Sequence, residues 1–578
     1  MIETYIDKQN ALIKKKTAIM TKPTLAIYGI KDRNSFQYPT FVHDHNLCLM
    51  QDGEIIQYLQ LERYTRRKYD NRLDLFIEEL IDDKTLELPN EFDLVCVNDY
   101  TGNAFISQSG RLHFEANYQK NLSPQLISAR AYYNDTEGLN GKNLTAFCCP
   151  HELAHIFSCI PFYGTFKENS LLVSFDGASS LGNYSAFLYR NGKLSLIENN
   201  WKDLGFASKF FNDNKLSFSM LGAKPYEHCS VPGKLMGFAS WGNYRQDIEE
   251  WLKENDYFNC CGKHSEIGIL SSIKEHFGNV CEEYDTHNQF LQDAAATLQQ
   301  IFENAVLRKL ESLQQKYHCN HLYYGGGCAL NIVTNSKIIE SGMFKDVFIA
   351  PCCNDSGLSI GAAAFLECQK GNEIKIHSPY LNNVGLDFKD IVMPSTNLIK
   401  TAATILLSGG IIGVCNGIAE AGPRALGNRS LIALANNKEL SQKISMKVKK
   451  REWYRPVAPI MLLENAQKVT GQKISELSRF MLQDFTIKKE YHEQLAGVVH
   501  ANNTARIQTI SKENDNPFMF RLLSYLNEEY GILALINTSF NAQGEPIVHT
   551  KNDAFFSAKK MNLDALIYNN KLYRNEDF

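Results

Sequence analysis

The sequence predicts an α/β protein with a duplicated N-terminal domain and a second α/β domain at its C-terminal end. The first of two matching patterns is a buried strand at 25–30, followed by two strand-like runs at 46–50 and 54–62. Asp52 and Gly53 lie between these runs, and Asp-Gly between apolar runs is typical of a hairpin turn. The first half of the domain is therefore expected to begin with a strand and a hairpin.

The second pattern repeats the first about 145 residues later, and such self-similarity indicates a duplicated structural unit. A strand at 171–175 precedes runs at 184–190 and 193–198, which flank Asn191 and Gly192. An actin- or hexokinase-like nucleotide-binding fold has this duplication and binds its ligand between the two parts. We therefore expect a ligand between two similar halves.

Length, charge and composition narrow the classes of function. A chain of 578 residues exceeds the size of one ordinary core, so two or three domains are expected. The formal net charge of -4 gives no reason to expect a nucleic-acid or membrane partner, and no apolar stretch approaches the roughly 20 residues that span a bilayer. The fifteen cysteines are scattered, and residues 1–22 carry charges without the apolar core of a signal peptide. Free thiols in a reducing cytoplasm are the simpler interpretation.

The chain divides into a leader at 1–23, an actin-like domain at 24–370, a connector at 371–395 and a C-terminal domain at 396–578. The connector has little periodic signal and contains Pro379 and Pro394, which is typical of a boundary between domains. Before it, residues 285–318 are predicted to form a helix. Four apolar side chains share one face of that helix: Phe290, Ala294, Leu298 and Ile301.

Residues 148–155, Cys-Cys-Pro-His-Glu-Leu-Ala-His, carry the first chemical signal. His151 and His155 are four residues apart, so on a helix both imidazoles project from one face and can bind one divalent metal ion. Glu152 completes a His-Glu-x-x-His pattern, in which a zinc metallopeptidase would use the glutamate as its general base. A peptidase would not explain the arginine-rich blocks near the C-terminus. A structural pair of histidines is the other alternative.

Four blocks in the C-terminal domain combine arginines with short polar side chains. They are Gly422–Ser430, Arg451–Pro456, Thr504–Gln508 and Asn537–Asn541. The guanidinium groups of Arg424, Arg455 and Arg506 are the strongest candidates to bind phosphate, because they bind phosphoryl oxygens bidentately and stay charged. Hydroxyl and amide contacts would come from Asn537, Ser539 and Asn541. Arg429 and Arg451 suit structural ion pairs as well as a phosphate site.

Together with Gly544–Pro546, these blocks resemble the O-carbamoyltransferases, the family that includes the nodulation-factor, cephalosporin and tobramycin carbamoyltransferases. The resemblance covers about residues 24–575, and several long motifs in one order are more specific than any single motif. Upstream, the motifs that match in the same order are His43-Asp44, Glu62-Arg63 with Lys68, the histidine pair, Lys234–Gly237 and Gly326–Asn331.

The resemblance implies an enzyme with two active sites. The C-terminal domain, similar to the threonylcarbamoyl-AMP synthase fold, would join carbamoyl phosphate and ATP, with Mg²⁺, into carbamoyl-adenylate. The N-terminal domain would then move the carbamoyl group onto a hydroxyl of a sugar or other small acceptor. An internal channel between the sites is expected, because the mixed anhydride would hydrolyse in water. The protein partner expected is a second copy of the chain, in a homodimer.

The resemblance also implies roles for single residues. His151 and His155 would be joined by Asp176 and Asp355, a set that suits Fe(II) or Zn(II), and the family points to iron. His43 would be the general base at the acceptor hydroxyl. The residues expected to bind carbamoyl-adenylate are Lys68, Gly326, Gly327 and Asn331.

Two departures from the family leave other interpretations open. Pro150 stands where the family has a second histidine, and Ala178-Ser179-Ser180 replaces a bulkier, often acidic run. The second departure would retune the acceptor pocket, or it would mark a nucleotide-binding regulator that has lost transfer activity. Modification of tRNA is disfavoured by the charge balance. A solvated basic face is at least as good an interpretation as a ligand site for Arg63, Arg66 and Arg67.

Overall fold

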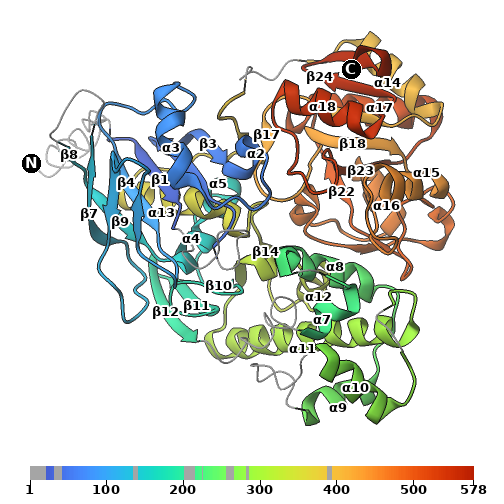
Figure 1. Cartoon of the computed structure of the whole chain (residues 1–578), viewed down its shortest axis with the longest axis horizontal. Helices are drawn as coiled ribbons and strands as arrows, with labels where there is room; N and C mark the ends of the chain where they lie inside the picture. The colour runs from blue at the N-terminus through green and yellow to red at the C-terminus, as the bar shows by residue number, and fades with distance from the viewer. Residues whose placement is uncertain are drawn as a thin grey trace, which may run out of the picture.

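The computed structural model of the chain describes residues 21–30, 42–134, 141–200, 215–223, 225–255, 266–281, 285–386 and 393–578. Three bodies are visible in Figure 1: two adjoining sheets coloured mainly blue to cyan, a group of green helices, and a C-terminal α/β domain coloured orange to red. The predicted leader at 1–23 lies outside the described residues except for 21–23. Along the described chain, no helix is both long and apolar enough to cross a membrane.

The first half of the N-terminal domain is built on a nine-stranded sheet. Its strands are β1 (Thr24–Tyr28), β2 (Asn46–Gln51), β3 (Glu54–Gln60), β4 (Asp93–Val97), β5 (Ala104–Ile106), β6 (Leu112–Glu115), β7 (Ile127–Tyr133), β8 (Lys142–Asn143) and β9 (Ala146–Cys149). The order β3-β2-β1-β4-β9 places β2 antiparallel to β1 and β3, and β4 parallel to β1 and β9. The strand predicted at 54–62 ends at Gln60, because the chain turns there into helix α2 (Leu61–Thr65).

The second half repeats this order on a five-stranded sheet. Its strands are β10 (Ser170–Phe175), β11 (Tyr184–Arg190), β12 (Lys193–Asn200), β13 (His321–Gly325) and β14 (Asp346–Phe348). In the order β12-β11-β10-β13-β14, β11 is antiparallel to β10 and β12, and β13 is parallel to β10 and β14. Each half is thus a strand with a hairpin followed by two parallel strands. The predicted duplication and the actin-like fold class are confirmed.

Two helices lie between the halves and bring their segments together. α4 (His151–Phe157) packs on β10 and β13 of the second sheet, while α13 (Leu358–Lys370) packs on β1, β2 and β4 of the first. The two helices also pack on each other. A Cβ atom at Gly361 would lie 1.8 Å from the carbonyl oxygen of Ala154, so glycine permits this close approach.

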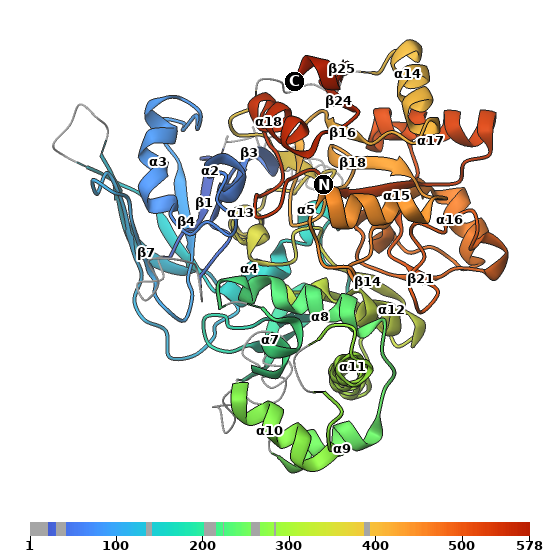
Figure 2. The ribbon, with the colours of Figure 1, turned by 45° about the vertical axis from the view of Figure 1, so that its right-hand side comes forward.

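The helical body confirms the helix predicted at 285–318. α11 (Gln289–Tyr317) packs against α8 (Val231–Ala239) and is seen end-on in Figure 2. It begins after Asn288, whose side chain accepts a hydrogen bond from Leu291 N, and it ends at His318 in the left-handed conformation. All four side chains predicted to share its buried face are buried: Phe290, Ala294, Leu298 and Ile301.

The C-terminal domain is a seven-stranded sheet with helices on both faces. Its order is β22 (Gln508–Ile510), β19 (Ala458–Leu462), β23 (Leu535–Ser539), β18 (Arg429–Leu434), β16 (Ile412–Cys415), β24 (Ala565–Tyr568) and β25 (Lys571–Arg574). α14 (Thr396–Leu407) and α17 (Pro517–Tyr530) cover one face, and α16 (Leu463–Thr470) and α18 (Lys551–Met561) cover the other. Successive side chains at 431–433 of β18 alternate between the two cores, which is why this part of the strand is apolar on both faces.

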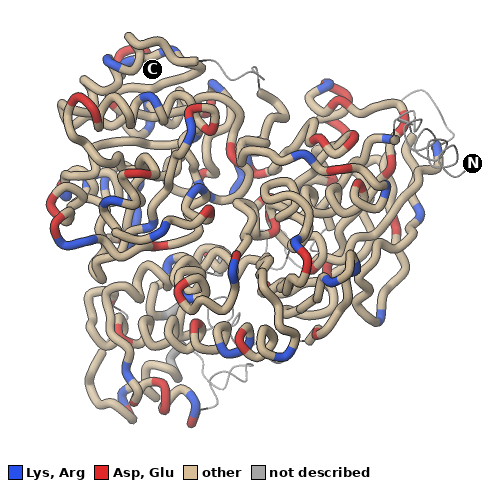
Figure 3. Tube along the Cα trace, turned by 180° about the vertical axis from the view of Figure 1, so that it is seen from behind, with Lys and Arg blue, Asp and Glu red and all other residues tan. Residues whose placement is uncertain are grey.

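The connector joins the two domains through a short strand pair, β15 (Tyr380–Asn382) with β17 (Ala419–Glu420). Two arginines of the N-terminal domain add contacts to the C-terminal domain. Arg63 is fully buried and donates to the carbonyl oxygen of Gly422 at 2.9 Å. Arg66 donates to the carbonyl oxygens of residues 546 and 547 at 2.8 and 2.7 Å. A solvated basic face is therefore the wrong interpretation for both Arg63 and Arg66. Over the whole of both domains, acidic and basic residues are interspersed (Figure 3).

Candidate functional site

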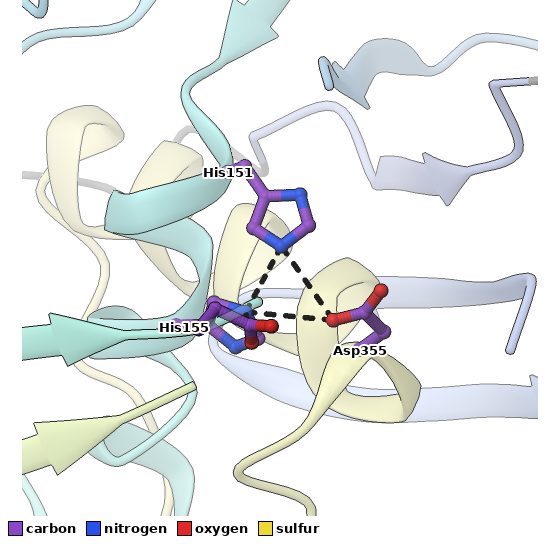
Figure 4. Close-up of side chains that lie close together, drawn as sticks. His151, His155 and Asp355 are labelled. Atoms are coloured by element: carbon purple, nitrogen blue, oxygen red, sulfur yellow. Dashed lines mark hydrogen bonds and ion pairs between the residues drawn. The ribbon is translucent and has the colours of Figure 1, made fainter. Parts of the chain in front are cut away.

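Four predicted ligands converge between the two halves of the N-terminal domain. His151 and His155 lie one turn apart on α4, which starts directly after Pro150. Asp176 follows β10, and Asp355 opens the short helix η3 (Asp355–Gly357) before α13. We call His151, His155, Asp176 and Asp355 the metal cluster. Figure 4 shows both histidines and Asp355 pointing toward one another.

Ligand atoms of the metal cluster lie within 4.8 Å of one another. The two Nε2 atoms are 3.0 Å apart, and Asp355 Oδ1 lies 3.5 Å from His151 Nε2 and 3.6 Å from His155 Nε2. Asp176 Oδ2 lies 3.0 Å from His155 Nε2. Two imidazole nitrogens and two carboxylate oxygens so arranged fit a divalent cation, and the set suits Fe(II) or Zn(II).

The electrostatics of the metal cluster also favour a cation. Both histidines are almost completely buried. Burial alone would lower the pKa of His151, but Asp355 and Asp99 raise it well above its usual range. In the metal-free protein a proton on His151 thus balances part of the carboxylate charge. A divalent cation would replace that proton and bind the neutral imidazole.

Asp99, which sequence reasoning missed, lies beside Nδ1 of His151, the ring nitrogen that does not face the other metal ligands. Its Oδ2 lies 3.2 Å from His151 Nδ1, and the pair meets the distance but not the angle of a hydrogen bond. Thr101 N donates to Asp99 Oδ1 at 3.3 Å and holds the carboxylate in a turn after β4. Because β4 and β9 are parallel neighbours, Asp99 and His151 leave the sheet at the same end. A carboxylate two residues after a buried strand is the signal that could have found it.

The carboxylates of the metal cluster are held by other groups. Tyr28 donates its hydroxyl to Asp355 Oδ2 at 3.1 Å. The backbone N–H groups of Gly177 and Gly327 donate to Asp176 Oδ1 and Oδ2 at 2.5 and 2.6 Å. Nδ1 of His155 has no hydrogen-bond partner among the described residues. Three of the four ligands are therefore oriented by a neighbouring group.

Glu152, between the two histidines in sequence, turns away from the metal cluster. It accepts hydrogen bonds from Leu181 N at 2.9 Å and from Ser180 Oγ. Ser180 Oγ also accepts a hydrogen bond from His151 N at 3.3 Å, so the run that departs from the family supports the start of α4. This geometry does not provide the general base that the metallopeptidase alternative requires.

His43, the predicted general base, lies beside the metal cluster. Its Nδ1 is 3.0 Å from Asp44 Oδ2 and 3.9 Å from Asp355 Oδ2. Burial alone would lower the pKa of His43, but Cys229, Asp355 and Asp44 raise it well above its usual range. Because a cation would neutralise Asp355, metal binding favours the basic form of His43. Cys229 and its neighbour His228, 3.4 Å apart from Sγ to Nε2, had no signal in the sequence.

The glycines and Asn331 predicted to bind adenylate have structural contacts of their own. Gly326 has a φ of +94°, and a Cβ there would lie 2.1 Å from the carbonyl oxygen of Phe175. Only glycine therefore fits between β13 and the end of β10. Asn331 caps α12 (Ile332–Glu340) by accepting from Thr334 N at 3.1 Å, and it exchanges hydrogen bonds with Gln299.

Five cationic side chains of the C-terminal domain and Lys68 surround a common space. We call them the cation cluster: Lys68, Arg424, Lys449, Arg451, Arg455 and Arg506. Burial and mutual repulsion lower the pKa of Lys449 and Arg506 well below their usual ranges, and that of Arg451 to about 9. The Nε atoms of Arg424 and Arg506 have no hydrogen-bond partner in the described part of the chain. An anion such as phosphate would neutralise this concentration of positive charge.

Two members of the cation cluster bind the last polar block. Lys449 Nζ donates to the carbonyl oxygen of Ser539 and to Asn541 Oδ1, both at 2.5 Å. Arg451 Nη2 donates to Ser539 Oγ at 3.1 Å. Sequence reasoning missed Lys449 and left Arg451 open, although the basic run at 449–451 was a usable signal. The geometry brings Ser539 and Asn541 next to the cations.

Asn537 and Arg429 connect parts of the C-terminal domain. Asn537 Nδ2 donates to the carbonyl oxygen of Ala425 at 3.1 Å and to Gln508 Oε1 at 2.5 Å, which joins three of the four predicted blocks. Arg429 is fully buried and donates to the carbonyl oxygens of Gly417 and Asn428 at 2.8 and 2.9 Å. Its contacts are those of a structural residue.

One cavity of about 1210 Å³ connects these groups. Its wall includes His43, Asp176 and Asp355 from the N-terminal domain and the whole cation cluster, together with Ser539 and Asn541. Gly327, Asn331 and Asn537 line it too, whereas Gly326 is not part of the wall. Except for His151, His155 and Gly326, the predicted site residues of both domains therefore line one space.

The backbone is strained at four non-glycine residues of this wall, one of which is Met481 with a φ of 56°. Asp44, Tyr69 and Lys450 have φ angles of 57°, 57° and 48°, in the left-handed region that costs a non-glycine residue about 1–2 kcal/mol. They lie next to His43, to Lys68, and between Lys449 and Arg451. The fold thus accepts strain beside His43, beside Lys68 and within the run at 449–451.

Comparisons with known proteins agree with the two-part architecture. The family model for the carbamoyltransferase N-terminus matches residues 36–364, and that for the carbamoyltransferase C-terminus matches residues 403–575. Among solved structures, full-length HypF in its phosphate- and nucleotide-bound form is similar, with 13% identity and a TM-score of 0.32 over 62% of this chain and 57% of that one.

Two relatives match over most of both chains. The nodulation protein NolNO of Sinorhizobium fredii is 27% identical over 576 residues, which are 94% of this chain and 80% of the relative. The 3'-hydroxymethylcephem-O-carbamoyltransferase of Streptomyces clavuligerus is 26% identical over 554 residues, 92% of this chain and 97% of the relative. With both family domains present in order, the chain belongs to the carbamoyltransferase family and is a transferase of that type.

Proposed function

We propose that the protein is an ATP-dependent O-carbamoyltransferase with two reactions in one cavity. The C-terminal domain forms carbamoyl-adenylate from carbamoyl phosphate and ATP, and the N-terminal domain transfers the carbamoyl group to a hydroxyl of a small acceptor. The observation that supports both steps is the cavity of about 1210 Å³, which is lined by His43, by the carboxylates of the metal cluster and by the cation cluster. A shared path between the sites keeps a mixed anhydride from water.

In the first step the cation cluster neutralises phosphate groups. Water releases inorganic phosphate from carbamoyl phosphate, and an oxygen of the resulting carbamate attacks the α-phosphorus of ATP as pyrophosphate leaves. The attack brings anions together, so fixed guanidinium groups lower its barrier. Arg424, Arg455 and Arg506 bind phosphoryl oxygens, while Ser539 and Asn541 orient them. Mg²⁺ accompanies ATP.

In the second step the acceptor hydroxyl attacks the carbamoyl carbon, and the bond from that carbon to the AMP oxygen breaks. His43 takes the hydroxyl proton, while Asp44 Oδ2, at 3.0 Å, fixes its other ring nitrogen. Lys68 binds the adenylate beside it. His151, His155, Asp176 and Asp355 would hold a divalent metal, which when bound would supply positive charge for the phosphate of the adenylate. We assign this metal as Fe(II), with Zn(II) as the alternative.

The acceptor is a small hydroxylated molecule, such as a sugar or a natural product. One relative is named for O-carbamoylation of a 3'-hydroxymethylcephem, which supports transfer to oxygen. The interspersed charges seen in Figure 3 support neither a nucleic acid nor a membrane as partner. We propose that the protein acts in the cytoplasm.

Two variants separate the two steps. Arg506→Ala is expected to lose the pyrophosphate release that depends on carbamoyl phosphate, and to regain product when synthetic carbamoyl-adenylate is added. His43→Ala is expected to release pyrophosphate but to make no carbamoylated product. Mass spectrometry for the gain of one carbamoyl group across hydroxylated metabolites identifies the acceptor. If carbamoyl-adenylate does not restore product to the Arg506 variant, the two-site assignment is wrong.

A further inference from the structure

We propose that Lys234, on α8 of the N-terminal domain, is a positioning residue for the phosphate site of the C-terminal domain. It binds Glu452 and thereby keeps the neighbouring Arg455 available for an incoming phosphate. The inference deepens the proposed function and rests on it, because it concerns the same phosphate site.

Lys234 forms two ion pairs, and one of them crosses the domain boundary. Its Nζ lies 2.6 Å from Glu227 Oε1 in the same domain and 2.7 Å from Glu452 Oε1 in the C-terminal domain. The lysine side chain is only 8% exposed. Glu227 and Glu452 are 27% and 32% exposed, so solvent screens these pairs in part, though less than it screens a pair in which both groups are exposed.

Glu452 is shared between two cations. Its Oε1 pairs with Lys234, and its Oε2 lies 3.4 Å from Arg455 Nη1. Burial would raise the pKa of Glu452, but Lys234 and Arg455 lower it below its usual range, so the group is a carboxylate at neutral pH. Without Lys234, both oxygens would be free for the planar guanidinium group, which favours a bidentate pair. An Arg455 held in that way is withdrawn from phosphate.

The segment around Glu452 has other contacts, with α8 and with the turn that follows it, that do not involve Lys234. Trp241 Nε1 donates to the carbonyl oxygen of Tyr454 at 3.3 Å. The rings of Phe238 and Tyr454 pack with their centroids 5.0 Å apart. These contacts hold the segment in place when the charge of Lys234 is removed, so the expected effect is on Arg455 rather than on the fold.

The test compares Lys234→Met with Lys309→Met in the release of pyrophosphate from ATP that depends on carbamoyl phosphate. Lys309 pairs with Glu198 at 2.5 Å, is 18% exposed and lies outside the cavity wall, so it controls for the loss of a partly buried Lys–Glu pair. For Lys234→Met we expect the KM for carbamoyl phosphate to rise roughly tenfold, the cost of one lost charge-assisted contact, with a smaller change in kcat. Lys309→Met should keep the wild-type KM.

Two further measurements distinguish positioning from a general structural effect. Adding Glu452→Gln to the Lys234→Met variant removes the competing charge and should return the KM to within about threefold of wild type. With synthetic carbamoyl-adenylate, Lys234→Met should transfer the carbamoyl group at the wild-type rate. An unchanged KM, no recovery in the double variant, or slow transfer would each overturn the inference. If wild-type protein itself releases no pyrophosphate, the proposed function fails and the inference falls with it.

Discussion

Replacing Asp99 with asparagine should weaken metal binding while leaving the fold intact. Asp99 is 6% exposed, and its Oδ2 lies 3.2 Å from His151 Nδ1. When His151 binds a metal through Nε2, its proton must lie on Nδ1, where the negative charge of the nearby Asp99 carboxylate stabilises it. Asparagine has nearly the same shape as aspartate, so the substitution removes the charge without opening a cavity.

The expected loss of metal affinity lies between roughly tenfold and a hundredfold. An asparagine that turns its carbonyl oxygen to His151 remains a neutral, weaker acceptor and gives the smaller loss. One that turns its NH₂ group to Nδ1 makes that nitrogen an acceptor, which shifts the proton to Nε2 and gives the larger loss. The two factors correspond to about 1.4 and 2.7 kcal/mol.

Asp346→Asn is the matched control, because Asp346 Oδ2 lies 2.9 Å from His321 Nδ1, outside the metal cluster. Purified proteins are loaded with Fe(II) or Zn(II) and dialysed against a graded series of chelator concentrations. Metal bound per chain, measured by plasma mass spectrometry, gives the relative affinities, and thermal unfolding of the metal-free proteins checks the fold. Equal metal retention by the Asp99 and Asp346 variants would refute the role of Asp99.

Three other predictions follow from the same geometry. Gly326→Ala should lower the free energy of unfolding by at least about 3 kcal/mol in urea melts, because its Cβ would meet the carbonyl oxygen of Phe175. The control is Gly192→Ala, which has open space around it and should lower the free energy of unfolding by about 1 kcal/mol. Arg66→Ala should cost about 2 kcal/mol by removing its two hydrogen bonds to the C-terminal domain, and an unchanged urea midpoint would contradict this. Because the folded pKa of His151 is raised, the metal-free protein should lose stability as pH rises from about 6.5 through that pKa. Metal affinity should rise over the same pH range, because the metal binds the deprotonated imidazole. Differential scanning calorimetry and metal titration at several pH values measure the two opposite trends.

The duplicated halves were predictable because their signals are local. An apolar run, an Asp-Gly or Asn-Gly turn and a second apolar run specify a hairpin before anything packs on it. The end of β3 was placed two residues too late, because a short apolar run suits the last residues of a strand and the first of a helix equally well. The ligand roles of Lys68 and Arg506 remain predictions, although both side chains line the cavity that the proposed function requires.

The sequence by itself determined the relation between His151 and His155, since a spacing of four residues on a helix places two side chains on one face in any tertiary context. It also determined the order of the family motifs. Only the tertiary structure decided what meets those motifs. Asp99 reaches His151 because two parallel strands end side by side, and Asp176 and Asp355 reach it because α4 and α13 pack between the sheets. Convergence of distant segments depends on strand order and helix packing, which are properties of the whole domain and leave no mark at any single residue.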